Sequence, residues 1–266
     1  MEEEGGSRRW AVNAAEWKPS SAEFDLFLSA LPLCDWEAVL RFVRIEDRKM
    51  GILSRLLQRK LVNSVLGIPY KEIIIHRTPQ GKPFLANDRR RLSLPEFNFN
   101  VSHHGDYVAI ASEPHHLVGV DVMSHDPRIK EQPPAYVENF RSCFTALEWG
   151  NIMSSKPDHK KILHQFYRHW CLKEAYVKAI GIGLGFNLQR LEFFFLDGEI
   201  WGQVASVRID GKHREDWSFS LHQLDNEHCV CVAKGSSQEG SMEKYPVDKQ
   251  PFKILTVDEL LPNNQK

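Results

Sequence analysis

The most informative stretch of the sequence places an acid and a base on one side of a helix. Trp170, Glu174 and Lys178 are spaced by four residues, so their side chains share one helical face. One interpretation of Glu174 and Lys178 is an ordinary surface ion pair, because an acid four residues before a base is the favourable order. The other is a pair of catalytic groups. The spacing alone leaves both interpretations open.

A second acid, Asp121, lies in the strand-like run Leu117–Met123. Alternation along a strand puts its valines on one face and Gly119, Asp121 and Met123 on the other. Asp121 is therefore either a strand-end aspartate that faces solvent or caps a backbone amide, or an oxygen ligand for magnesium. Magnesium takes one or two protein carboxylates together with water and substrate phosphates. On the second interpretation, Gly119 lets a substrate approach the backbone.

Two polar segments offer contacts for an anion. In residues 77–83 a turn at Gly81 brings Arg77 and Lys82 together. In residues 98–104 the polar face of a strand ends in Ser102 and His103, which can donate to phosphate oxygens. A solvated turn and a capped hairpin end are the alternatives. The sequence contains neither a glycine-rich phosphate loop followed by Lys-Ser/Thr nor a dinucleotide fingerprint.

The elements that must position these residues occur in the same order twice. Apolar residues at helical spacing predict an amphipathic helix over 46–66, and a second long helix is expected over 159–180. Each helix is followed by short strand-like runs bounded by turn residues. The runs begin near Ile73 and lie at 97–102, 107–111 and 117–122, then near 190–196, 203–209, 217–222 and 228–233. We therefore expect an α+β fold of two similar halves, each a long helix on a small antiparallel sheet.

This order divides the chain into three parts. We expect an N-terminal lobe over residues 1–122, a C-terminal lobe over 123–234, and a polar linker with a C-terminal segment over 235–266. Within the last part, residues 252–257 could return as one edge strand. Ligands often bind where two such lobes meet.

Composition excludes several classes of protein. The 34 basic and 35 acidic residues nearly cancel, which argues against a nucleic-acid partner or an anionic membrane surface. No stretch approaches the roughly 20 apolar residues of a membrane-spanning helix, and the acidic N-terminus does not resemble a signal peptide. Five scattered cysteines fit reduced thiols. We expect a cytoplasmic protein, with an organellar location, for example mitochondrial, left open.

Taken together, the motifs in residues 77–83, 98–103, 118–123 and 170–178 resemble the ordered motifs of the Sfp-type 4'-phosphopantetheinyl transferases. The resemblance is closest to the animal-like subgroup of that family, and it spans residues 10–234. Each motif is weak alone. The four in order form a specific signature, which favours the functional interpretation of each.

The resemblance implies a fold, a reaction and a site. The fold is a pseudo-twofold pair of α+β lobes with coenzyme A between them. The reaction is magnesium-dependent transfer of 4'-phosphopantetheine from coenzyme A to a serine of an apo acyl or peptidyl carrier protein, which gives the holo carrier and 3',5'-ADP. A monomer is expected. The alternative is a non-catalytic regulator that binds coenzyme A or a carrier protein.

Site roles also follow from the resemblance. Glu174 and Lys178 are the implied catalytic residues, and Asp121 and Glu174 the implied magnesium ligands. The implied coenzyme A contacts are Arg77, Thr78, Pro79, Gln80, Gly81, Lys82, Asn100, Val101, Ser102, His103, Asp121, Glu174 and Lys178.

Two positions depart from the family pattern. Met123 stands where bacterial relatives often have a third acid, so water or a coenzyme A oxygen should replace that ligand. Ala38 stands where the animal-like subgroup supplies an arginine. Arg41, Arg44 or Arg48 could substitute, and the sequence does not choose among them.

Overall fold

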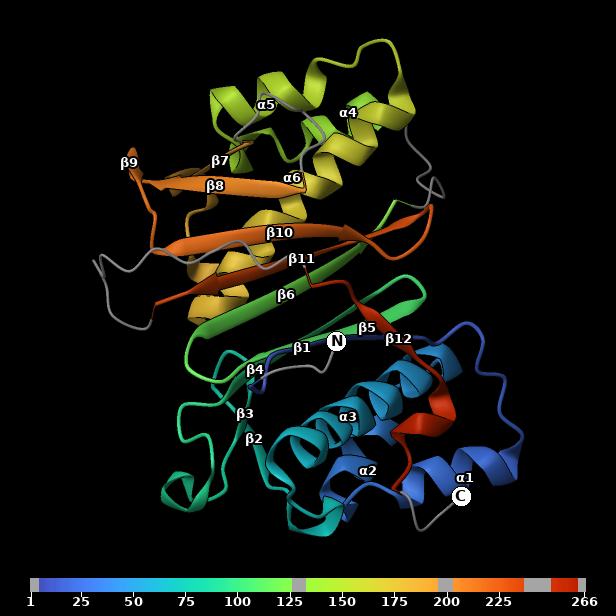
Figure 1. Ribbon diagram of the computed structural model, residues 1–266. Helices are drawn as coiled ribbons and strands as arrows, with labels where there is room; N and C mark the ends of the chain where they lie inside the picture. Colours follow the sequence, from blue (N-terminus) through green and yellow to red (C-terminus); the bar gives the residue numbers. More distant parts are fainter. Residues whose placement is uncertain (1–4, 126–132, 196–202, 237–249, 263–266) are drawn as a thin grey trace.

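The computed structural model describes residues 5–125, 133–195, 203–236 and 250–262. Two layered units, each a helix layer against a sheet, lie one above the other in Figure 1. Among the described residues, no helix is long and apolar enough to cross a membrane.

The N-terminal lobe, in the lower half of Figure 1, is built on a four-stranded sheet of order β12-β1-β5-β4. Its helix α3 (Ile45–Leu66) turns a row of buried leucines toward this sheet and ends at Gly67, which has a left-handed backbone. The other elements are β1 (Arg8–Asn13), α1 (Ser21–Ser29), α2 (Leu33–Leu40), β2 (Ile75–Arg77), β3 (Pro83–Leu85), β4 (Asn98–His104), β5 (Tyr107–Glu113) and β12 (Lys253–Leu255).

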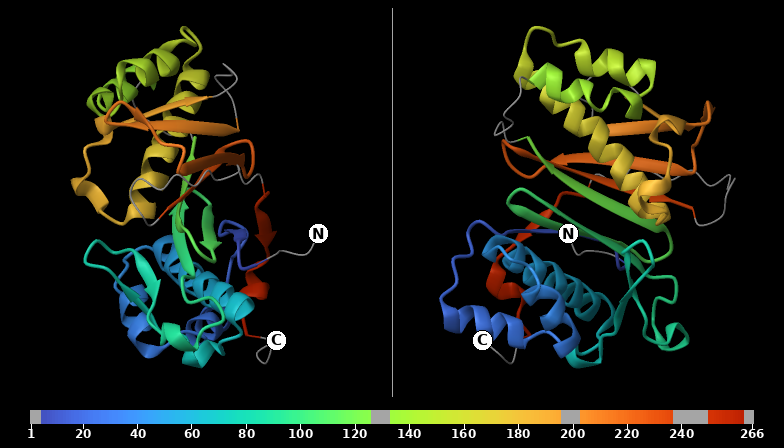
Figure 2. Two further views of the ribbon diagram at one scale, coloured as in Figure 1. Left: turned by 60° about the vertical axis from the view of Figure 1, so that its left-hand side comes forward. Right: turned by 180° about the vertical axis from the view of Figure 1, so that it is seen from behind.

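The C-terminal lobe is built on a six-stranded sheet whose main path is β6-β11-β10-β8-β7. Helix α6 (His159–Ile180) runs along one face of this sheet, chiefly over β6 and β11 (Figure 2). The other elements are β6 (Leu117–Ser124), α4 (Pro133–Glu138), α5 (Ala146–Met153), β7 (Leu191–Phe195), β8 (Val204–Ile209), β9 (Lys212–His213), β10 (Trp217–Gln223) and β11 (His228–Gly235).

The predicted α+β architecture is confirmed, with differences in detail. Both long helices are present within one residue of their predicted ends. The strand expected from Ile73 begins at Ile75, because residues 70–72 form a 3-10 turn and Ile74 N donates to the Asn87 side chain. The C-terminal segment does return as an edge strand, but β12 pairs with β1 in parallel, the exception to antiparallel pairing among the described strands.

The strand β6 lies in the second sheet. It pairs with β11 along its whole length, from Leu117 opposite Gly235 to Ser124 opposite His228. The element that carries Asp121 therefore packs with the C-terminal lobe, although the sequence analysis ends the N-terminal lobe after residue 122. The division of the chain at that residue stays a prediction.

Side chains of β4 join the two sheets. β4 and β6 are each at the edge of their own sheet, so their outward backbone groups need other partners. Alternate side chains of β4 accept hydrogen bonds from alternate backbone N–H groups of β6. The bonds are Val120 N to Asn100 Oδ1 at 2.9 Å, Val122 N to Ser102 Oγ at 3.3 Å, and Ser124 N to His104 Nδ1 at 2.8 Å.

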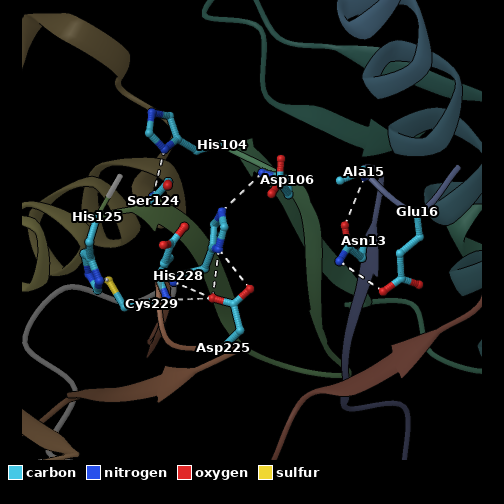
Figure 3. Close-up of polar contacts among 11 residues, drawn as sticks. Asn13, Ala15, Glu16, His104, Asp106, Ser124, His125, Asp225, His228 and Cys229 are labelled. Atoms are coloured by element: carbon cyan, nitrogen blue, oxygen red, sulfur yellow. Dashed lines mark hydrogen bonds and ion pairs between the residues drawn. The ribbon is translucent and has the colours of Figure 1, made fainter. Parts of the chain in front are cut away.

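His228 links two turns at the end of this junction (Figure 3). His228 Nε2 accepts from Asp106 N at 3.2 Å, and its Nδ1 lies 2.9 Å from the Asp225 carboxylate. The β4–β5 turn of one lobe is thereby bonded to the β10–β11 turn of the other. Because β4 and β6 carry two of the four site motifs, these contacts set the position of one of these motifs relative to the other.

Gly119 is required by the packing of α6 on β6. A methyl group at Gly119 would lie 2.0 Å from Ala175 O and 2.5 Å from Ala179 N. Both atoms belong to the helix backbone, which cannot withdraw as a flexible side chain could. The expectation that Gly119 lets a substrate approach the strand is wrong, because α6 occupies that space.

We predict that Gly119→Ala lowers the free energy of unfolding by about 1–3 kcal/mol or more, because the new methyl group overpacks a rigid contact. Urea titration followed by circular dichroism measures the change. Gly150→Ala in α5 is the matched control, since nothing lies within 4 Å of the added methyl, and it should be neutral or stabilising by up to about 1 kcal/mol. Equal stability of the two variants would contradict the prediction.

Candidate active site

A cavity of about 720 Å³ lies between the lobes, walled by α3, the turn after β2, β4 and α6. Most of the residues that the sequence analysis proposes as ligand contacts come together here. Those that line the cavity are Arg77, Gln80, Gly81, Lys82, Asn100, Val101, His103, Glu174 and Lys178. Thr78, Pro79, Ser102 and Asp121 do not line it.

Asp121 lies just behind the cavity wall, with 4% of its surface exposed. Its Oδ1 accepts from Lys178 Nζ at 2.5 Å and from Ser102 Oγ at 3.0 Å. Its Oδ2 is buried and has no hydrogen-bond partner. A solvent-facing aspartate is therefore excluded, and the lone oxygen is a strong acceptor that lacks a donor or a cation.

Lys178 pairs across the lobe junction. Its ammonium bonds to Asp121 of β6 and, at 2.7 Å, to Ser102 Oγ of β4. Among the described residues its ion pair is with Asp121, so the surface pair with Glu174 is not formed. Three elements that are distant in sequence thus meet at one ammonium group.

Glu174 lines the cavity one helical turn before Lys178. Burial raises the pKa of its carboxyl, the negative charge of Asp121 raises that pKa further, and Lys178 opposes both effects. Two carboxylates that repel each other this way favour a bound cation or a shared proton.

The donor set fits magnesium. Magnesium prefers oxygen ligands and commonly takes two carboxylates plus water and phosphate oxygens. Asp121 and Glu174 supply two carboxylates, one with an unpartnered buried oxygen. No group of three or more metal-binding side chains occurs among the described residues. Met123 gives no third ligand, because its side chain packs against the hydrophobic clusters of the C-terminal lobe.

The opposite wall of the cavity is cationic. Arg77 lines it, and its Nη1 donates to Gly81 O at 3.0 Å. Arg55 of α3 lines it as well, with its Nε 3.0 Å from Asp35 Oδ1. Arg55 is not distinguished in the sequence, because it is one of several basic residues on the polar side of an amphipathic helix.

The ammonium group of Lys82 bonds to backbone carbonyl groups of this chain. Its Nζ donates to Ala179 O at 2.7 Å and to Val118 O at 3.4 Å. Burial lowers the pKa of this ammonium to about 8. Carbonyl groups at the C-terminal end of a helix attract a cation, so Lys82 ties the turn after β2 to the end of α6, while its stem lines the cavity.

The remaining predicted contacts divide between structure and cavity. Thr78 shapes the turn, since its hydroxyl accepts from Lys82 N at 3.2 Å. Pro79 is exposed. Asn100 is 3% exposed and uses its oxygen for β6. His103 faces the cavity, and burial, followed by the charge of Lys178, lowers the pKa of its imidazole.

Two further features escaped the sequence analysis. The apolar wall of the cavity includes Met50, Phe186 and Leu188, which come from elements whose pairing the sequence pattern does not show. Lys173, next to Glu174, is fully buried against Glu148 Oε2 at 2.9 Å and donates to Leu191 O at 2.6 Å. A buried ion pair with its other hydrogen bonds made fixes the orientation of α6.

Comparison with known proteins gives a consistent result along the chain. The family model described as "4'-phosphopantetheinyl transferase, N-terminal" matches residues 15–115. The model described as "4'-phosphopantetheinyl transferase superfamily" matches residues 117–233. The two matches meet just before β6, the strand that carries Asp121.

Individual relatives are similar over most of their length. The L-aminoadipate-semialdehyde dehydrogenase-phosphopantetheinyl transferase of Mus musculus is 39% identical over 264 residues, covering 95% of this chain and 84% of the mouse protein. The Homo sapiens protein of the same name is 37% identical with the same coverage. A phosphopantetheinyl transferase of Thraustochytrium sp. is 39% identical over 228 residues, covering 84% and 77% of the two chains. The similarity extends over the segments that form both lobes. The chain therefore belongs to the 4'-phosphopantetheinyl transferase superfamily of enzymes.

Proposed function

We propose that this enzyme transfers the 4'-phosphopantetheine arm of coenzyme A to a serine of an apo carrier protein, in a magnesium-dependent reaction that releases 3',5'-ADP. The observation that carries the proposal is the unpartnered buried oxygen of Asp121 beside Glu174 and Lys178, at the wall of the inter-lobe cavity. A carboxylate pair with an adjacent ammonium suits a magnesium-bound pyrophosphate.

Each charged residue has a role in this reaction. The serine oxygen attacks the β-phosphorus, and the bond from that phosphorus to the 3',5'-ADP oxygen breaks. Glu174 is placed to accept the serine proton, because its carboxylate lines the cavity one helical turn from Lys178. Lys178 offsets the charge of the pyrophosphate. Magnesium held by Asp121 and Glu174 would neutralise the phosphate oxygens.

The cavity walls supply binding. The cations of the α3 side attract the phosphates of coenzyme A, and the apolar wall with Trp170 and Phe186 provides contact area for uncharged parts of the ligand. His103, whose pKa is lowered, is neutral at pH 7 and donates one hydrogen bond to a phosphate oxygen.

The acceptor is a carrier protein. We propose a carrier domain of lysine metabolism, as in the enzyme for which the mouse and human relatives are named, and also an acyl carrier protein of fatty-acid synthesis. We propose that the enzyme acts as a monomer in the cytoplasm and that it has no nucleic-acid or membrane partner. The family membership favours catalysis over a purely regulatory role in binding coenzyme A.

We predict that Glu174→Gln lowers the rate of transfer by about 10²- to 10⁴-fold, the usual contribution of a general base, and that Asp121→Asn has a comparable effect. The intact mass of an apo carrier protein, followed over time with coenzyme A and magnesium, measures the rate. Glu37→Gln, at an exposed acid on α2, is the control and should react like wild type. Wild-type rates in either site variant would refute the assigned roles.

The raised pKa of Glu174 predicts how the stability of the metal-free enzyme depends on pH. Because the folded protein favours the protonated acid, wild type loses stability as the pH rises from the ordinary carboxylate pKa of 4.5 through the raised pKa of Glu174. Glu174→Gln should therefore have the higher Tm at pH 7 without metal, and the difference should vanish below about pH 4, where the acid is protonated in both states. Thermal scans across pH measure this, and an equal or lower Tm for the variant at pH 7 would contradict it.

A further inference from the structure

The hydroxyl group of Ser102 has its whole hydrogen-bonding capacity in use. It donates to Asp121 Oδ1 at 3.0 Å, and it accepts from Lys178 Nζ at 2.7 Å and from Val122 N at 3.3 Å. A serine hydroxyl has one donor and two acceptor positions, so these three bonds fill it. Ser102 is 4% exposed and does not line the cavity. Its hydroxyl is therefore committed to groups of this chain, with no position left for a ligand oxygen.

The three bonds of Ser102 cross from one lobe to the other. Ser102 belongs to β4 in the sheet of the N-terminal lobe, whereas Asp121 and Lys178 belong to β6 and α6, which pack on each other in the C-terminal lobe. The acid and the base of the site thus come from one lobe, and the hydroxyl that contacts both comes from the other. The arrangement of this charged pair is complete only when the two lobes are in contact.

The orientation of the Asp121 carboxylate follows from these bonds. The main chain of Asp121 is held from the side of α6, since its carbonyl accepts from Cys171 Sγ at 2.9 Å. The freedom that remains is chiefly rotation of the carboxylate, a torsion with broad minima. Ser102 and Lys178 both bond to Oδ1, while Oδ2 is buried without a partner. Two donors on one oxygen therefore keep the other oxygen available.

Loss of the hydroxyl would remove this distinction between the two oxygens. Lys178 would lose one acceptor and Oδ1 one donor, so the carboxylate could turn and offer either oxygen to the ammonium. A cation at Oδ2 would then compete with Lys178 for the same negative charge. Hydrogen bonds to metal-binding side chains commonly set metal affinity in this way.

We propose that Ser102 is a positioning residue that reserves Asp121 Oδ2 for magnesium and couples magnesium binding to the contact between the lobes. The inference rests on the proposed function and deepens it, because it assigns a residue that acts through Asp121 and Lys178. The hydroxyl itself contacts neither the cation nor coenzyme A.

Isothermal titration of magnesium into the full chain saturated with coenzyme A, without a carrier protein, tests the proposal. Ser102→Ala should raise the Kd for magnesium by about 10- to 100-fold, the usual effect of removing a partner of a metal ligand. Ser102→Thr keeps the hydroxyl at a strand position, where a β-branched residue is well accommodated, and should restore most of the affinity. Ser102→Cys, whose thiol is a weak donor, should also weaken binding, and it replaces the alanine variant if that variant does not fold.

His104→Ala is the matched control. It removes another hydrogen bond of the same junction, the one from Ser124 N at 2.8 Å (Figure 3), and leaves the three bonds of Ser102 in place. It should bind magnesium like wild type. Equal weakening in His104→Ala and Ser102→Ala would show that any loosening of the junction has this effect, and it would overturn the specific role of Ser102.

Titration of coenzyme A in EDTA separates positioning from ligand contact. Ser102→Ala should bind coenzyme A like wild type when no metal is present. Weaker binding in EDTA would show that Ser102 contacts the ligand, and an unchanged Kd for magnesium would also overturn the proposal. The proposed function fails by a different result, namely wild-type protein that binds magnesium and coenzyme A but modifies no carrier protein, and that result leaves the magnesium test intact.

Discussion

Edge strands β4 and β6 meet through side chains, and the geometry of the cavity depends on that contact. The outward N–H groups of β6 would otherwise be unpaired at the junction of two lobes, where leaving a donor without a partner costs about 1–3 kcal/mol. Asn100, Ser102 and His104 accept three of these N–H groups at a spacing of two residues. This pattern fixes the register of one sheet edge on the other. It also sets Asp121 opposite Ser102, so the same hydroxyl that holds the strand contacts the acid.

The position of α6 follows from a second set of contacts. Gly119 allows the helix backbone to lie directly on β6. Lys173 anchors the helix from its buried side through Glu148, and Lys82 binds the carbonyl of Ala179 near its last turn. These contacts fix the distance of α6 from β6 and its rotation about its own axis. They therefore fix where Glu174 and Lys178 lie relative to Asp121. Preorganised charges of this kind are what phosphoryl transfer requires, because little covalent chemistry falls to the protein.

The sequence reveals much of this site and conceals some of it for definite reasons. Helical periodicity predicts α3 and α6, and strand alternation separates Asp121 from its neighbouring valines. Spacing within one element shows which residues share a face, but it does not show what covers that face. Spacing therefore offers Glu174 as one possible partner for Lys178, whereas the ion pair of Lys178 is with Asp121, 57 residues away in sequence. Asn100 and Lys82 look like ligand contacts in a polar motif, yet their polar ends bind β6 and α6. Arg55 stands among other basic residues of α3, and only the packing of α2 and the turn after β2 places it at the cavity.

The central claim is that two carboxylates of this chain hold magnesium for transfer from coenzyme A. It is tested most directly by the intact mass of an apo carrier protein incubated with the wild-type enzyme and coenzyme A, with magnesium, with EDTA, and with EDTA followed by excess magnesium. The account predicts a gain of one phosphopantetheine group per carrier with magnesium, none with EDTA, and recovery when magnesium is restored. A carrier that gains no mass with magnesium, or gains it equally in EDTA, would contradict the account.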